Sequence, residues 1–290
     1  LRRRLRLRRL TSPAGPVTGR RPRRDRTDPP EDHRLSTIST DRWYDEITGS
    51  TATLAQLTDG ADLTRPVPTC PEWTLRQLIT HVGRAHRWAA AIVTTRSPVP
   101  IPFREVPDGK LPGNPLEHAG WLRTGAAGVV DAVRAAGDEQ VWTHPGPGPA
   151  WYWARRMAHE TAVHRADGQI ALGQRPQIDP VTAADGIDEW LGFLAEPDPG
   201  AGRPALARLH GKVLHVHVTG QEVAAGEWMI RPAAGGITVE PGHGKGDVAV
   251  RGPASDLLLL LLRRIPPDDP AVEVLGDAAV LGELLAATPF

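Results

Sequence analysis

The chain has 290 residues, of which 40% are hydrophobic and 23% charged, and 34 basic side chains balance 34 acidic ones. This composition is typical of a globular protein of one or two domains and excludes a peptide hormone or a collagen-like fibre. The nearest approach to a membrane span is the leucine run 257–262, far below the roughly 20 apolar residues that a spanning helix needs, so we expect no membrane association.

Cys70 is the single cysteine of the chain. One thiol cannot form an intramolecular disulfide or a multi-cysteine zinc or iron–sulfur site. The cysteine count therefore favours the reducing cytoplasm, and any metal ion must be held by histidines and carboxylates.

The first 34 residues carry 12 arginines against four acids, whereas the remaining 256 residues carry 22 basic and 30 acidic groups. No apolar segment of signal-peptide length follows these arginines, so neither a secretory nor a twin-arginine signal is expected. A basic arm for nucleic acid or anionic lipid is one interpretation. We favour a disordered tail over residues 1–35, which includes the case of an over-extended reading frame, since the chain begins with Leu1. The acidic remainder has no nucleic-acid-binding motif, so we expect no such partner.

Apolar residues recur at helical spacing through much of residues 36–196, and the most regular pattern begins near Thr74. Four or five helices joined by loops of this length favour an antiparallel bundle. The predicted helices cover residues 37–57, 74–93, 115–136, 151–172 and 181–195. The segment 143–149 between the third and fourth helices is expected to be a loop.

The second half changes to the short, alternating pattern of strands, with glycines at the turns. Strands are expected at 212–220, 226–233, 235–242 and 246–254, followed by a helix at 254–264, a strand at 272–275 and a helix at 276–287. We therefore predict a small α+β domain with an antiparallel sheet over residues 205–290. The Pro- and Gly-rich segment 196–204 is the expected link to the bundle of residues 36–196.

A metal site is suggested by Glu160 and His164, which lie four residues apart on the fourth helix and therefore on one face. His81 lies in the middle of the second helix, which an antiparallel bundle can turn toward the fourth. Three protein ligands leave a coordination position open, as a catalytic metal requires. Spacing alone leaves the alternative open, because such pairs also form simple surface contacts and the chain has eleven histidines.

Five other reactive side chains have two interpretations each. His86 and His159 do not share a helix face with the three candidate ligands, and we favour surface or supporting roles for both. His215 and His217 alternate on one strand and could bind a metal together, but we favour the polar face of a sheet. Cys70 could be a nucleophile activated by the following helix, but we favour a buried structural thiol because no base is placed beside it.

Four tryptophans lie within the predicted helical region or immediately before a helix. We interpret them as bundle core and pocket wall rather than as an aromatic cage for a cation. They are Trp73, Trp88, Trp151 and Trp153.

Four segments of the sequence carry a resemblance to a known family. They are VPTCPEWTLRQLITHVGRAHRW at 67–88, HETAVHRADGQIAL at 159–172, GEWMI at 226–230 and GKGDVAVRGPASDLLLLLLRR at 244–264. Together they resemble the maleylpyruvate isomerase family of mycothiol-dependent, actinobacterial enzymes, over about residues 37–288. The resemblance implies a DinB-like four-helix bundle followed by a sterol-carrier-like α+β domain. It also implies a divalent metal, usually zinc, held by His81, Glu160 and His164.

The resemblance further implies a cytoplasmic enzyme that uses mycothiol and a metal-bound thiolate on a small electrophile. The reaction would be either cis–trans isomerisation of the maleylpyruvate type or transfer of the thiol. Arg251, Arg263 and Arg264 are candidates for binding a substrate carboxylate.

Two alternatives to a catalytic metal remain. In the first, the protein is a non-catalytic carrier whose leucine-rich helix 255–262 holds a hydrophobic ligand. In the second, the metal only stabilises the bundle.

Overall fold

The computed structural model describes residues 38–144, 146–196, 204–220, 223, 226–233 and 236–288. The expected disordered tail of residues 1–35 and most of the expected linker at 196–204 lie outside these ranges. Within them, no helix combines the length and apolar character needed to cross a bilayer.

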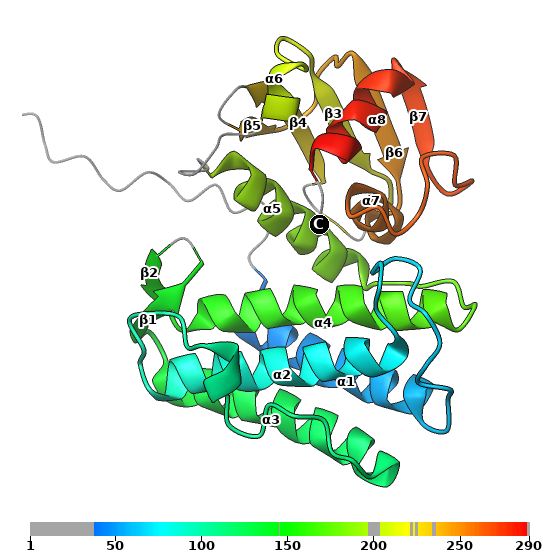
Figure 1. Cartoon of the computed structure of the whole chain (residues 1–290). Helices are drawn as coiled ribbons and strands as arrows, with labels where there is room; N and C mark the ends of the chain where they lie inside the picture. Colours follow the sequence, from blue (N-terminus) through cyan, green and yellow to red (C-terminus); the bar gives the residue numbers. More distant parts are fainter. Residues whose placement is uncertain are drawn as a thin grey trace, which may run out of the picture. The chain divides into compact units, whose positions relative to one another are not determined.

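The first four long helices form the predicted bundle (Figure 1). The helices α1 and α2 each pack against both α3 and α4. They cover Thr40–Thr58 (α1), Leu75–Thr94 (α2), His118–Ala136 (α3) and Trp151–Ala171 (α4), close to the predicted ranges.

Helix α2 begins where its sequence provides a capping box. The side chain of Thr74 accepts a hydrogen bond from the backbone N–H of Gln77, and the Gln77 side chain accepts one from the backbone N–H of Thr74. One turn later, Leu78, Ile79 and Val82 are fully buried in the bundle core. The cap and the apolar stripe together fix the rotation of α2 about its axis, and so fix which of its side chains meet α4.

Helices α2 and α3 approach closely at Gly83, where a Cβ atom would overlap the indole ring of Trp121. A Gly83→Ala variant is therefore expected to lower the free energy of unfolding by about 1–3 kcal/mol, because the ring cannot shift without disturbing the core. Urea unfolding would measure the change. In the matched control Gly128→Ala the new methyl group meets nothing within 4 Å, so the control is expected to gain up to about 1 kcal/mol. Equal stabilities of the two variants would contradict the close contact.

The segment predicted as a loop between α3 and α4 contains a two-stranded hairpin instead. Strand β1, Gln140–Thr143, pairs antiparallel with β2, Gly146–Pro149. The four residues of β2 are Gly-Pro-Gly-Pro, which have low strand propensity and no alternation, so the sequence gives no strand signal there. The loop between α2 and α3 adds two single-turn helices, η1 (Phe103–Glu105) and η2 (Pro115–Glu117).

Helix α5, Pro180–Ala195, begins at Asp179, whose side chain accepts hydrogen bonds from the backbone N–H groups of Val181 and Thr182. It packs against α7, Ala254–Leu261, and its buried Ile187 and Leu191 belong to the same hydrophobic cluster as the inner face of the C-terminal sheet. Helix α5 therefore shares the core of the α+β region that follows it.

The C-terminal region is built on a five-stranded sheet in the order β5-β4-β3-β6-β7. The pairing is antiparallel throughout except between β3 and β6, which are parallel. The predicted α+β region with an antiparallel sheet is therefore present, with one parallel pair that was not predicted. The strands are Leu214–Val218 (β3), Glu227–Ala233 (β4), Gly236–Pro241 (β5), Val248–Gly252 (β6) and Glu273–Gly276 (β7).

The parallel pair follows from the path of residues 242–247 between β5 and β6. Strand β5 ends level with Trp228, whereas β6 begins beside Leu214, at the other end of β3. The connection therefore runs back along the sheet, and Gly244 and Gly246 lie close to Met229 and to the backbone of His215. A prediction that pairs each strand with the next one along the chain cannot give this return path.

The two faces of the sheet are covered by different parts of the chain. Leu214 and Val216 of β3 are buried in one core together with α5, α7 and the terminal helix α8, Ala278–Ala287. The short helix α6, Pro204–Ala207, also contributes a buried leucine to this core. His215 and His217 project to the opposite face, over which residues 242–247 return.

Candidate metal centre

Helices α2 and α4 bring His81, Glu160 and His164 into one cluster. The Nε2 atom of His81 lies 2.7 Å from Oε1 of Glu160, and Nε2 of His164 lies 3.2 Å from the same oxygen. The three potential ligand atoms lie within 4.8 Å of one another. The geometry expected from the helical spacing of Glu160 and His164 and from an antiparallel neighbour is thus present.

Glu160 is held in its ionised form by its neighbours. Burial opposes ionisation, but the positive charge of Arg156 and hydrogen bonds with His164 and His81 outweigh it and hold the pKa of Glu160 well below its ordinary value. Arg156 in turn pairs with Glu189 of α5. An anionic carboxylate is therefore available beside the two imidazoles at neutral pH.

His164 is oriented from behind by Asp167, whose Oδ2 atom lies 2.8 Å from Nδ1 of the imidazole. This contact leaves Nε2 directed at Glu160. Burial lowers the pKa of His164, but the contacts with Asp167, Cys70 and Glu160 raise it well above the ordinary value. These contacts therefore favour the protonated imidazole over the neutral one.

Asp167 is completely buried and is itself bound on both carboxylate oxygens. Arg264, from the segment after α7, donates from Nε to Oδ1 at 3.0 Å and from Nη2 to Oδ2 at 3.1 Å. The hydroxyl of Thr69 also donates to Oδ1. Burial raises the pKa of Asp167, but His164 and Arg264 lower it far more, so that the carboxylate stays charged.

The donor set fits a divalent transition metal. Two imidazoles and one carboxylate are ligands that zinc accepts, and an imidazole whose second nitrogen is held by a carboxylate is the usual supporting arrangement for a metal-bound histidine. Both Nε2 atoms converge on a single carboxylate oxygen, which leaves the solvent side of His81, one-third exposed, for a further ligand.

Cys70 lies in contact with this cluster, which the sequence did not indicate. Its thiol is only partly buried, and Sγ lies 3.3 Å from Oδ2 of Asp167. Potential ligand atoms of Cys70, His164 and Asp167 also lie within 4.8 Å of one another. The interpretation as a buried thiol was therefore wrong, because Cys70 is only partly buried, and the loop before α2 brings it to Asp167 of α4, 97 residues away in the sequence.

Of the four singled-out tryptophans, Trp73 contacts the cluster. Its ring centroid lies 4.8 Å from that of His81 and 5.8 Å from that of His164. Trp88 and Trp153 instead pack against each other and against Trp142. Trp151 stacks on Trp43 of α1. Trp73 thus contacts two candidate ligands, whereas Trp88 and Trp153 belong to the bundle core and Trp151 packs against it.

The three arginines singled out from the sequence lie in different surroundings. Arg251 pairs with Glu273 on the neighbouring strand, and Arg263 is exposed at a φ of 61°. Arg264 reaches the cluster but is bound to Asp167, so it supports the cluster and is not placed to bind a substrate carboxylate. The cation that directly contacts the candidate ligands is Arg156, which carried no sequence signal beyond its position one turn before Glu160.

His159 is buried, contrary to a surface role. Its two ring nitrogens lie 2.9 Å from Asp185 and 2.8 Å from Glu189, and the charge of Glu189 and both contacts raise its pKa against the effect of burial. Helix α4 is enclosed by α1 and α2 on one side and by α5 on the other, so even its polar positions are buried. A periodicity argument that assumes one exposed face does not apply to such a helix.

His86 is also buried, with Nε2 2.8 Å from the hydroxyl of Thr161. Burial lowers its pKa to about 4. Between pH 6.5 and 4 the unfolded chain therefore binds a proton that the folded protein does not, so stability falls as the pH falls.

Wild-type protein is expected to lose about 3 kcal/mol more than a His86→Gln variant between pH 7 and pH 4, because glutamine keeps a polar partner for Thr161 but does not titrate. Urea unfolding of both proteins at the two pH values measures this difference. Parallel losses would show that His86 does not titrate in this window.

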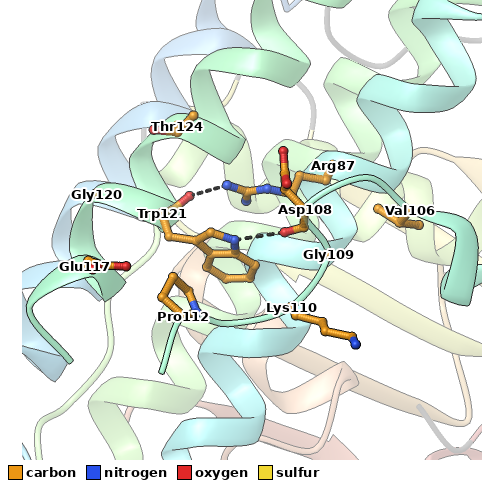
Figure 2. A pocket seen from close by; sticks show the side chains of 10 residues that line it. All are labelled: Arg87, Val106, Asp108, Gly109, Lys110, Pro112, Glu117, Gly120, Trp121 and Thr124. Atoms are coloured by element: carbon orange, nitrogen blue, oxygen red, sulfur yellow. Dashed lines mark hydrogen bonds between the residues drawn. The ribbon is translucent and has the colours of Figure 1, made fainter. Parts of the chain in front are cut away.

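A separate hollow of about 760 Å³ lies beside α2 and α3 (Figure 2). Trp121 crosses it, donating from its indole nitrogen to the carbonyl of Asp108, while Arg87 donates to the carbonyl of Trp121. None of the three candidate metal ligands lines it. Arg87, which lines the hollow, is already bound to the carbonyl of Trp121.

Family models place this arrangement among known proteins. Residues 44–168 match the mycothiol maleylpyruvate isomerase N-terminal domain, and residues 182–283 match the C-terminal domain of the same family. The chain belongs to the mycothiol maleylpyruvate isomerase family. The first family domain contains all three candidate metal ligands, and the second contains Arg264. No curated protein sequence matches the chain.

Solved structures support the fold of this family member. The mycothiol-dependent maleylpyruvate isomerase aligns with a TM-score of 0.54 and 17% identity, covering 83% of this chain and 94% of that one. A mutant of that isomerase aligns with the same TM-score and coverage at 16% identity. The expected two-part architecture, a helical region followed by an α+β region, is therefore confirmed.

Proposed function

We propose that the protein is a cytoplasmic, metal-dependent enzyme in which His81, Glu160 and His164 hold a divalent cation, zinc by preference, that activates the thiol of mycothiol. The observation that carries this proposal is the convergence of two imidazoles and an ionised carboxylate beside a partly exposed edge. Family membership favours the same chemistry.

The bound cation would supply Lewis acidity that turns a thiol into a thiolate near neutral pH. Side chains around the candidate ligands support this activation of the thiol. Asp167 holds the imidazole of His164 so that Nε2 would be available to a bound ion, and Arg156 keeps Glu160 ionised. The indole ring of Trp73 packs against both imidazoles and limits their movement.

Two reactions fit the same site. In an isomerisation, the thiolate adds to an activated double bond of the substrate, the resulting single bond rotates, and elimination restores both the double bond and the thiol. In an S-transfer, the adduct is protonated and released. Both need a small electrophile and a thiol, and the choice depends on the substrate.

The alternative of a hydrophobic-ligand carrier has no support at the helix on which it rests. The leucines of α7 are buried in the domain core, and Leu258 and Leu262 line a hollow of only about 20 Å³. A hollow of this size has room for about one water molecule, so an apolar ligand does not fit there.

The test is a titration of cobalt-substituted protein with mycothiol. We expect a sulfur-to-cobalt charge-transfer band that appears only when the thiol is added and that persists in a Cys70→Ser variant. A band before the addition that is lost in Cys70→Ser would mean that the protein's own thiol takes the open position. Bound cobalt without a thiol band in either protein would reduce the metal to a structural role and overturn the proposal.

A further inference from the structure

The outer face of the C-terminal sheet gathers a second set of metal-ligating side chains. His215 and His217 come from β3, Glu227 from the start of β4, and His243 from the return segment 242–247. Their potential ligand atoms all lie within 4.8 Å of one another. None of the four belongs to the bundle cluster, and neither their side chains nor their elements take part in the function proposed above.

The four side chains converge on the carboxylate of Glu227. Nε2 of His215 lies 3.0 Å and Nδ1 of His243 lies 2.8 Å from Oε2, while Nδ1 of His217 lies 3.5 Å from Oε1. The imidazole centroids are 5.0 to 6.1 Å apart. In a tetrahedral zinc site with bonds of about 2.0–2.1 Å, ligand atoms lie about 3.3 Å apart, so small side-chain rotations suffice to reach this geometry.

The backbone holds three of these ligands in place. His217 and Glu227 are directly paired across β3 and β4, and His215 lies two residues along the same face. The return segment carries His243 over this face, and its turn is fixed where the N–H of Gly242 donates to the carbonyl of Glu227. Strands β3 and β4 therefore supply three of the four side chains, and the return segment 242–247 supplies the fourth.

A purely polar surface explains this arrangement poorly. His215 is almost completely buried, and the contact that the structure gives its Nε2 is the carboxylate that His243 also contacts. One carboxylate is thus shared by three imidazoles on a face that the return segment partly covers. A divalent cation would give each imidazole its own bond and would neutralise the carboxylate.

We propose that His215, His217, Glu227 and His243 form a second metal site, for a divalent transition cation of the zinc class. Three imidazoles and one carboxylate complete a tetrahedron, which is the closed coordination of a structural site rather than the open coordination of a catalytic one. The ion would fasten the return segment 242–247 to strands β3 and β4. Its binding free energy would appear as added stability of the C-terminal region.

The test is metal stoichiometry, measured by equilibrium dialysis of the full chain against Zn²⁺ alone. Removing both strand ligands, in His215→Ala/His217→Ala, is expected to lower the bound zinc by one equivalent. The matched control His210→Ala, an exposed histidine outside both clusters, is expected to bind as much zinc as wild type. Unchanged stoichiometry in the double variant would overturn the proposal.

A second variant tests the same site in case the double variant does not fold. His243 is 74% exposed, so His243→Ala should fold normally, and we expect its zinc affinity at this site to fall at least about tenfold. The measurement is made in a His81→Ala/His164→Ala background, in which zinc should also raise Tm. Zinc that neither raises Tm in this background nor responds to His243→Ala would be adventitious surface binding and would also overturn the proposal.

Discussion

A His164→Ala variant is expected to bind a divalent cation in the bundle at least about 100-fold more weakly than the unchanged site, since even the loss of a residue that only supports a ligand costs 10- to 100-fold. The measurement uses competition with a chelator in a His215→Ala/His217→Ala background, so that the sheet cluster does not contribute. His164 is chosen because its Nε2 faces Glu160 while Asp167 fixes its Nδ1.

The matched control for this variant is His118→Ala. His118 is also a buried histidine with one observed hydrogen-bond contact, to the carbonyl of Pro112, but it belongs to neither cluster. Its loss should leave metal affinity unchanged. Equal affinities of the His164→Ala and unchanged proteins would remove His164 from the site and with it the metal chemistry proposed for the bundle.

An Arg264→Ala variant is expected to lose about 3–5 kcal/mol of the free energy of unfolding, because it removes the guanidinium that binds both oxygens of the fully buried carboxylate of Asp167. Urea unfolding of the metal-free protein measures this loss. The adjacent Arg263 is exposed and provides the matched control, with an expected change within about 0.5 kcal/mol for Arg263→Ala.

A double variant separates the ion pair from general damage to the core. In Asp167→Asn/Arg264→Ala no unpaired charge remains, so the combined loss should be smaller than the sum of the two single losses by at least about 1 kcal/mol. Additive losses would show that the two side chains contribute independently.

Much of the bundle follows from local patterns, as α2 illustrates. Its capping box and apolar stripe can be read from the residues themselves, and the helix begins and packs where they indicate. Helix α4 is different, because it is buried on several sides and its polar residues find partners on α2, α5 and the segment after α7. Single-sequence periodicity therefore located α4 but did not show that His159 is buried on it.

Pairings between segments that are distant in the chain could not be predicted from the sequence for a related reason. The parallel pair β3 and β6 depends on how residues 242–247 cross the sheet, which no local pattern encodes. The spacing of Glu160 and His164 did predict that these two side chains lie side by side in the candidate site. Asp167, Arg264 and Cys70 complete its surroundings only through the tertiary fold, and the four-ligand cluster on the sheet needed Glu227 and His243 to be brought beside the two strand histidines.

The ion pair between Asp167 and Arg264 also constrains how such proteins can diverge. Asp167 lies within the N-terminal family domain and Arg264 within the C-terminal one. A chimera that joined this bundle to a C-terminal partner without an equivalent arginine would leave the buried carboxylate of Asp167, directly behind His164, without its guanidinium partner. We therefore expect such a chimera to be less stable than this protein unless Asp167 is replaced together with Arg264.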